Sequence, residues 1–271
     1  MISVVGLGDN TVDRYVEQRM MYPGGNAVNV AVHARRLGQQ SAYIGCVGND
    51  RPGKLIYNAL VEEGVDVSRI RQMEGENAFC DIRLLDGDRV FGDYSEGLCP
   101  HLVLNEGDLK FLSRFDLVHT SVYSFVDDTL MKIKQRAKFL SYDFSSEWDE
   151  TLLADVLPKV DFALISQPVN DIREDIDLLQ WAASQGAKLV MVTSGDQGAA
   201  VYDGTNFYFQ PIVRIEKVID TLGAGDAFAA CFLTQYIAQV PITDALKEAA
   251  KYAASTCTQF GAFGHGTRYI I

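Results

Sequence analysis

The segment DTLGAGD, residues 220–226, places two glycines, an alanine and an acid before the apolar run AFAACFLTQYIA. If that run is a helix, its first turn presents free backbone N–H groups and a partial positive charge, and glycines let an anion approach them closely. The N–H groups of Gly223, Ala224 and Gly225 would form an anion hole. Asp226, in the first helical turn, could accept the proton of an attacking hydroxyl. This pairing suits phosphoryl transfer, which depends on positioning and on charge stabilisation.

A simpler interpretation of the same segment is purely structural. Asp220 or Thr221 would cap the helix and the glycines would form a tight turn. A lone GxGD would favour that interpretation, whereas the context of seven residues favours an anion site.

The elements around this segment alternate between strand and helix patterns. Continuous apolar strands separated by amphipathic helices predict an α/β fold with a mostly parallel central sheet covered by helices on both faces. The strands are expected at 2–7, 41–48, 117–122, 139–144, 162–166 and 188–195, and a strand-like run at 214–219. The helices are expected at 26–38, 55–64, 128–137, 150–158, 174–186 and 227–238. A hairpin at 199–209 would complete the sheet, and the whole chain, 1–271, is expected to form one domain.

One region interrupts the alternation. Residues 77–94 contain two alternating strands joined by Asp86-Gly87, a strong hairpin signal, with no helix between them. Together with the extended stretch 13–22, the hairpin could form a small sheet that stands away from the main domain. An ordinary hairpin at the edge of the main sheet is the open alternative.

Composition limits the classes of function. The chain has 48% hydrophobic and 22% charged residues, typical of a globular protein, and we expect a cytoplasmic location because no signal peptide or apolar run of membrane length is evident. A net charge of -12 argues against nucleic-acid binding. The 5 cysteines are scattered without CxxC pairs, so neither a disulfide framework nor a zinc site is expected. The 4 histidines also lack ligand spacing, and we expect them to be structural or exposed.

Two motifs resemble the signatures of the PfkB (ribokinase-like) carbohydrate kinases. DTLGAGD followed by AFAACF resembles the C-terminal signature, and PGGNAVNVAVHARRLG resembles the N-terminal one. The resemblance covers essentially the whole chain and implies a sugar kinase that uses ATP and Mg²⁺. It also implies a β-lid, here at about 13–23 and 77–97, that covers the sugar and could mediate a homodimer. A P-loop kinase is excluded because no GxxxxGK[ST] occurs.

The resemblance also assigns binding residues. Those implied for the sugar are Asp9, Asp13, Gly24, Gly25 and Asn29, with Asn10 nearby. Those implied for the nucleotide are Thr193, Gly195, Gly198, Thr221, Ala253, Thr256 and Gly261, with Ala262 beside them. For the small residues on the last helix, Ala253 and Thr256, simple close packing is an equally good interpretation.

The match to the family is incomplete at the metal. Many members carry Asn-x-x-Glu after a central strand, where the Glu organises magnesium through water, but Ser166 and Val169 stand at these positions. Magnesium would then be held mainly by phosphates and water, with indirect help from Asp143. Dependence on a monovalent cation such as K⁺ stays open.

Within the family, the segments GDNTVD, DRVFGDYSEG and YDFSSEWD resemble the branch that phosphorylates fructoselysine, a sugar joined to an amino acid, at O6. The substrate carries an ammonium group, which lid residues could bind through ion pairs or a cation–π contact. The candidates are Asp88, Arg89, Asp93, Tyr94 and Glu96. A solvated hairpin is the simpler interpretation.

Two other functions compete with this one. A ribokinase, fructokinase or nucleoside kinase would keep the chemistry and change the substrate. A catalytically silent sensor of sugar or nucleotide would explain the missing Asn-x-x-Glu, although the retained Asp226 argues against it.

Overall fold

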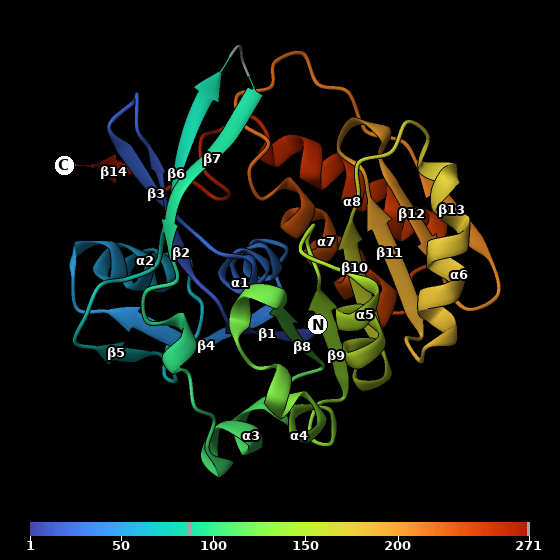
Figure 1. Ribbon diagram of the computed structural model, residues 1–271, viewed down its shortest axis with the longest axis horizontal. Coiled ribbons are helices and arrows are strands. Elements are labelled where there is room, and N and C mark those ends of the chain that lie inside the picture. Colours follow the sequence, from blue (N-terminus) through green and yellow to red (C-terminus); the bar gives the residue numbers. More distant parts are fainter. Residues whose placement is uncertain (86–87, 270–271) are drawn as a thin grey trace.

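The computed structural model describes residues 1–85 and 88–269, and the side chains of 84–89 are not described. Its main sheet has nine strands in the order β13-β12-β11-β10-β9-β8-β1-β4-β5 (Figure 1). From β10 across to β5 neighbouring strands run parallel, and β10 is also parallel to β11, while β12 and β13 form an antiparallel edge hairpin. The strands are β1 (Ser3–Gly8), β4 (Gln40–Gly48), β5 (Arg71–Met73), β8 (Leu117–Ser121), β9 (Phe139–Asp143), β10 (Phe162–Ser166), β11 (Leu189–Thr193), β12 (Ala199–Tyr202) and β13 (Phe207–Gln210).

Helices cover both faces of this sheet. Buried residues alternate along the strands, so Val4 packs with one helical layer and Val5 with the other. One layer contains α3 (Glu106–Leu112), α4 (Leu130–Lys134), α5 (Glu150–Val156) and α6 (Ile176–Ser184). The opposite layer contains α1 (Asn26–Arg36), α2 (Arg51–Glu62), α7 (Ala224–Ile237) and α8 (Ile242–Thr256). The predicted α/β fold with a mostly parallel sheet is confirmed.

Local signals explain where helices begin. Asp50 caps α2 by accepting from the amide of Gly53, with Pro52 in the first turn, so α2 starts earlier than its apolar pattern suggests. Helix α3 was not expected from the sequence. Its signal is a capping box in which Asn105 and Asp108 bond each other's backbone N–H groups.

A second, five-stranded sheet has the order β14-β3-β2-β6-β7. It contains β2 (Thr11–Tyr15), β3 (Met20–Gly24), β6 (Phe79–Leu85), β7 (Asp88–Ser95) and β14 (Thr267–Arg268). The hairpin of 77–94 therefore pairs with β2 and not with the edge of the main sheet, and its strands extend away from the helical layers (Figure 1). The expected Asp86-Gly87 turn lies outside the described residues.

The strand-like run at 214–219 is a wrong prediction, because the segment belongs to no strand. Val218 and Ile219 are solvent-exposed, and the amides of Ile219 and Asp220 both bond the carbonyl of Cys257 at the end of α8. The segment is thus an extended connection held by α8 rather than by the sheet. Within residues 1–85 and 88–269, no helix is both long enough and apolar enough to cross a membrane.

Candidate active site

Helix α7 begins as the DTLGAGD segment predicted. Gly223 is its N-cap, with φ 72°, and a Cβ there would lie 2.3 Å from the Cβ of Ala262, so both conformation and space require glycine. No side chain caps the helix, which leaves first-turn N–H groups for another acceptor. The amide of Ala224 is an exception, because it donates to the carbonyl of Thr221 at 3.2 Å. Of the three predicted donors, Ala224 is thus engaged in the turn.

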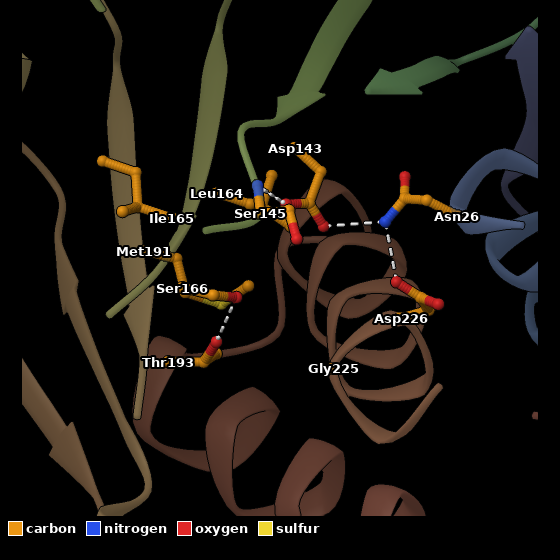
Figure 2. A pocket seen from close by; sticks show the side chains of 10 residues that line it. All are labelled: Asn26, Asp143, Ser145, Leu164, Ile165, Ser166, Met191, Thr193, Gly225 and Asp226. Carbon is orange, nitrogen blue, oxygen red and sulfur yellow. Dashed lines mark hydrogen bonds between the residues drawn. The ribbon is translucent and has the colours of Figure 1, made fainter. Parts of the chain in front are cut away.

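Asp226 lies in the first turn of α7 and is held by two amides from α1. Asn26 Nδ2 donates to Asp226 Oδ1 at 2.7 Å (Figure 2). Asn29 Nδ2 donates to Asp226 Oδ2, also at 2.7 Å. Desolvation, followed by the nearby Asp143 carboxylate, raises the pKa of Asp226 well above its ordinary value, and the two amides oppose that shift. A carboxylate that is oriented at both oxygens and raised in pKa is suited to accept a proton.

Asp143, at the end of β9, is the second acid of the pocket. Its Oδ2 accepts from Asn26 Nδ2 at 2.8 Å, and its Oδ1 accepts from the amide of Ser145 at 2.7 Å (Figure 2). Burial raises the pKa of Asp143 to about 6. Two acids on one amide favour a cation nearby, so the donor set fits magnesium held with water and phosphate oxygens. The described residues contain no cluster of three or more His, Cys, Asp or Glu that could hold a metal by itself.

Asp9 and Asp13 approach the site from the first two strands. Asp9 Oδ1 accepts from Ser121 Oγ, Ser124 Oγ and the amide of Ala27, so one of its oxygens is fully used inside the protein. Asp13 is buried, and its Oδ2 would lie 2.3 Å from a Cβ placed on Gly24. A larger residue at 24 would therefore displace that carboxylate from its present position.

Gly25 and Asn29 complete the sugar-binding candidates. Gly25 is the N-cap of α1 with φ 105°, and a Cβ there would lie 2.5 Å from Asn10 Cα. Asn29 was expected to reach a sugar hydroxyl, and the structure shows its Nδ2 bonded to Asp226. Its Oδ1 is buried without a hydrogen-bond partner in the described part of the chain, which leaves it an acceptor for a hydroxyl.

The residues that line the pocket include one of the nucleotide candidates, Thr193. The pocket is lined by Asn26, Asp143, Ser145, Leu164, Ile165, Ser166, Met191, Thr193, Gly225 and Asp226 (Figure 2). The hydroxyls of Ser166 and Thr193 lie 3.2 Å apart at the ends of adjacent strands. Gly195, with φ 46°, has open space where a Cβ would be, whereas Gly198, with φ 99°, would place a Cβ 2.1 Å from the carbonyl oxygen of Gln210.

The other nucleotide candidates lie in and after α8. Gly261 donates its amide to Asp220 Oδ2 at 2.9 Å, which ties the last loop to the start of α7. Thr256 Oγ1 donates to the carbonyl of Ala253 at 2.8 Å, so its hydroxyl is used within the helix. Thr221 is exposed.

Between described residues, no hydrogen bond links the lid candidates to the residues that line the pocket. Asp93, Tyr94 and Glu96 are exposed, Tyr94 at 73%. A bulge places Gly92 and Asp93 opposite a single residue of β6, because Cys80 pairs with Tyr94 and Ile82 with Phe91. The side chains of Asp88 and Arg89 lie outside the described residues.

Sequence reasoning missed two residues of the site. Asn26 lay inside the quoted glycine-rich motif but had no role, and His119 was expected only to be structural or exposed. His119 is fully buried and bonds Asn26 Oδ1 through Nε2 at 2.7 Å. The glycines before Asn26 were a usable signal for that residue, whereas a lone histidine in a strand gives none.

A helix start that carries an oriented carboxylate, beside a pocket lined by strand ends of a doubly covered sheet, is the arrangement expected of a ribokinase-like phosphotransferase. The model of the pfkB family carbohydrate kinase matches residues 1–264, and the chain belongs to this family. The predicted family and the class of sugar kinase are confirmed.

Named relatives extend over nearly the whole chain. It is 43% identical to a fructosamine kinase FrlD of Bacillus subtilis (strain 168), over 100% of this chain and 96% of the relative. It is 37% identical to a fructoselysine 6-kinase of Escherichia coli (strain K12), over 97% of this chain and 100% of the relative. Among solved structures, an Arabidopsis thaliana ribokinase complexed with ribose and ATP matches with a TM-score of 0.83 at 19% identity, over 97% of this chain and 95% of that one.

Proposed function

We propose that this protein is an ATP-dependent kinase that phosphorylates O6 of fructoselysine or a related fructosamine. The observation that carries the proposal is the Asp226 carboxylate, oriented by Asn26 and Asn29 at the uncapped N-terminus of α7. The two relatives named as kinases of fructosamines support the substrate class.

The reaction follows from this arrangement. The sugar hydroxyl approaches Asp226, which takes its proton as the oxygen bonds the γ-phosphorus of ATP. The bond between that phosphorus and the β–γ bridging oxygen breaks, and ADP leaves with the electron pair. First-turn amides of α7, with Gly223 and Gly225 allowing close approach, stabilise the charge on the transferring phosphoryl group.

Sugar and metal would be held by the groups beside Asp226. Asp13 and the unpartnered Asn29 Oδ1 would accept hydrogen bonds from sugar hydroxyls, and Gly24 and Gly25 leave room along the backbone. Magnesium, when bound, supplies charge neutralisation of the phosphates, and Asp143 would hold it through water. A putative ribokinase II of E. coli, with a TM-score of 0.77 at 20% identity, is described in complex with ATP and Mg²⁺. Use of K⁺ remains a prediction.

The five-stranded sheet is proposed as the lid over the sugar and as the surface of a homodimer. Its outer strand β7 exposes Val90 at 42%, Phe91 at 63% and Tyr94 at 73%. Exposed apolar side chains on an edge strand favour pairing with a second strand. Analytical ultracentrifugation of the protein and of a Phe91→Lys variant would test this, and a wild-type monomer at micromolar concentration would contradict it.

A substrate panel tests the main proposal. Purified protein is assayed with Mg-ATP and fructoselysine, fructose, ribose or a nucleoside, and the phosphate position is read by ³¹P and ¹³C NMR. We expect the highest kcat/KM for fructoselysine with phosphate on O6. Preferential phosphorylation of fructose or ribose would identify the other family activities, and ligand binding without phosphate transfer would indicate a sensor.

A further inference from the structure

Asn26 is the first residue of α1, yet its side chain does not cap its own helix. Its Nδ2 has two hydrogens and uses both, one to Asp143 Oδ2 at 2.8 Å and one to Asp226 Oδ1 at 2.7 Å (Figure 2). One amide therefore connects the last residue of β9, Asp143, with the first turn of α7, where Asp226 lies. Without it, the two carboxylates would repel each other. With Asn29 on the other oxygen of Asp226, the rotation of that carboxylate is fixed.

An amide can serve two carboxylates only if its nitrogen faces them, and His119 determines that orientation. Asn26 Oδ1 lies 2.7 Å from His119 Nε2, so Nε2 must carry a hydrogen. In the neutral ring Nδ1 is then an acceptor, and Ser141 Oγ lies 2.8 Å from it, closer than the 3.4 Å from this hydroxyl to the carbonyl of Val118. His119 and Ser141 are both fully buried, so water does not compete for these bonds.

The chain of hydrogen bonds begins and ends on the same strand, β9. Ser141 and Asp143 are two residues apart on β9, so their side chains lie on the same face of the sheet. The path runs from Ser141 through His119 of β8 to Asn26 of α1, and from there back to Asp143 and across to Asp226. With His119 Nε2–H donating to Asn26 Oδ1, both hydrogens of Asn26 Nδ2 point at carboxylates, which defines the polarity of the chain from His119 to Asp143 and Asp226.

We propose that Asn26 is a positioning residue for phosphoryl transfer and that neutral His119 locks its amide with the nitrogen toward Asp143 and Asp226. The proposal rests on the proposed function, because Asp226 is taken as the base. If the amide turned over, its oxygen would face two carboxylates, and Asp226 would lose both its orientation and a compensating dipole.

A purely structural network is the competing explanation, and it predicts a different pattern. It would lower the melting temperature of variants without changing the turnover of the fraction that folds. A positioning role lowers kcat while the KM of the sugar and the affinity for Mg-ATP stay near wild type.

The kinetic test uses matched substitutions at both positions. Asn26→Leu removes the amide, His119→Leu removes the donor, and His119→Gln retains a donor near the place of Nε2. We expect Asn26→Leu and His119→Leu to lower kcat by about 10- to 100-fold, the scale of a misplaced reacting group. His119→Gln should recover most of the loss. In the double variant Asn26→Leu/His119→Leu, kcat should be no lower than in Asn26→Leu alone.

Additive losses in the double variant, or an Asn26→Leu enzyme with kcat within about twofold of wild type, would overturn the proposal. A structural readout separates it from the proposed function. Long-range ¹H–¹⁵N spectra of ¹⁵N-histidine-labelled protein, with His119 assigned from His119→Gln, should show the Nε2–H tautomer. The Nδ1–H tautomer would contradict the lock even in a protein that phosphorylates fructoselysine. No phosphorylation of any sugar by wild type, with the Nε2–H tautomer present, would instead refute the kinase assignment.

Discussion

At the scale of single residues, the pocket brings several acidic side chains close together. Asp143 and Asp226 share the amide of Asn26, and Asp9 lies near enough to raise the pKa of both. Nearby like charges favour the neutral form of each acid. A cation that accompanies ATP would remove that penalty, so the acids suit a ligand that brings its own positive charge.

Asp13 provides a prediction that separates sugar binding from nucleotide binding. Asp13 is buried against Gly24 and is not among the residues that line the pocket at the strand ends. Asp13→Ala should raise the KM of the sugar by about 10-fold or more, the cost of losing hydrogen bonds to a carboxylate. The affinity for Mg-ATP, measured by calorimetry, should stay within a factor of about two. A parallel loss of ATP affinity would place Asp13 elsewhere or indicate misfolding.

The sequence predicted some of these residues and not others for a physical reason. The position of Asp226 follows from a local motif, because glycines and an acid at a helix start are readable within seven residues. The partners of Asn26 are distant in sequence, His119 by 93 residues and Asp226 by 200. Such contacts depend on how the strands are ordered, which no short pattern contains.

At the scale of elements, two helices point their N-termini at the same place. Helix α1 begins after Gly25 and α7 after Gly223, both with positive φ. In α1 the first-turn amide of Ala27 already donates to Asp9 Oδ1, whereas no side chain caps α7. The start of α7 therefore leaves N–H groups and a partial positive charge for the phosphates, which explains how a chain with a net charge of -12 can be proposed to bind a nucleotide.

The lid hairpin provides a prediction at this scale. Asp93→Asn with Glu96→Gln neutralises two exposed side chains without changing their shape. Because fructoselysine carries an ammonium group and fructose does not, kcat/KM should fall about 3- to 10-fold for fructoselysine and stay unchanged for fructose. Glu106→Gln, an exposed acid on α3, is the control. Equal losses for both sugars would remove these acids from recognition of the amino acid.

The element pattern was readable where strands are buried on both faces, as in the nearly continuous apolar runs of β10 and β11. It misled at 214–219, because alternation of polar and apolar residues also occurs in an extended connection. The second sheet could not be resolved from sequence alone, since the pairing of β2 with β6 joins segments separated by the whole of α1, β4 and α2.

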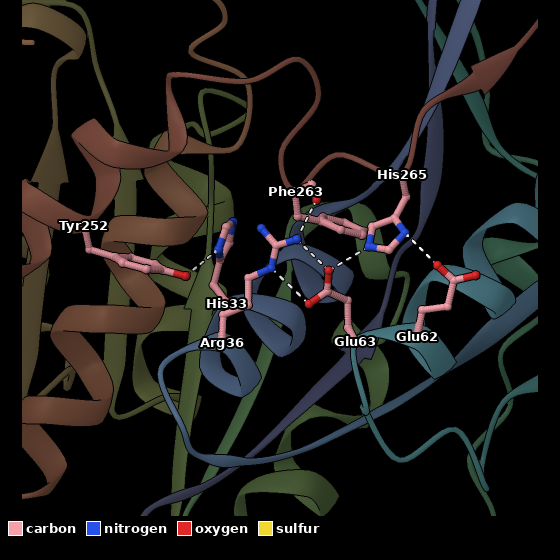
Figure 3. A network of polar contacts seen from close by, with 7 residues as sticks. All are labelled: His33, Arg36, Glu62, Glu63, Tyr252, Phe263 and His265. Atoms are coloured by element: carbon pink, nitrogen blue, oxygen red, sulfur yellow. Dashed lines mark hydrogen bonds and ion pairs between the residues drawn. The ribbon is translucent and has the colours of Figure 1, made fainter.

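At the scale of the whole molecule, a polar network joins the last loop to the first two helices (Figure 3). Arg36 bonds Glu63 and the carbonyl of Phe263, and His265 lies between Glu62 and Glu63. The same loop carries Gly261 and Ala262, which contact Asp220 and Gly223 at the start of α7. The network therefore holds the loop that shapes the predicted anion hole.

His33, at the edge of this network, predicts the pH dependence of stability. Burial and then the charge of Arg36 lower its pKa to about 3 from 6.5. Between these values the unfolded chain binds a proton that the folded one does not, so the free energy of unfolding falls as the pH falls below 6.5.

Urea unfolding at pH 7 and pH 5 checks this sign. His119 contributes a similar loss on acidification, and the raised pKa of Asp143 opposes both. In His33→Gln, the loss of stability between the two pH values should be smaller than in wild type by about 2 kcal/mol. His101→Gln, at an exposed position, should behave as wild type. An unchanged pH dependence in His33→Gln would contradict a buried neutral His33.

The central claim is that Asp226 is the base of a phosphoryl transfer, and Asp226→Asn tests it most directly. The substitution keeps the shape and removes the proton acceptor, so kcat with fructoselysine should fall by about 100-fold or more. The affinity for Mg-ATP, measured by calorimetry on the same folded variant, should stay the same or increase, because a negative charge near the phosphates is lost. Turnover close to wild type in that variant would contradict the account.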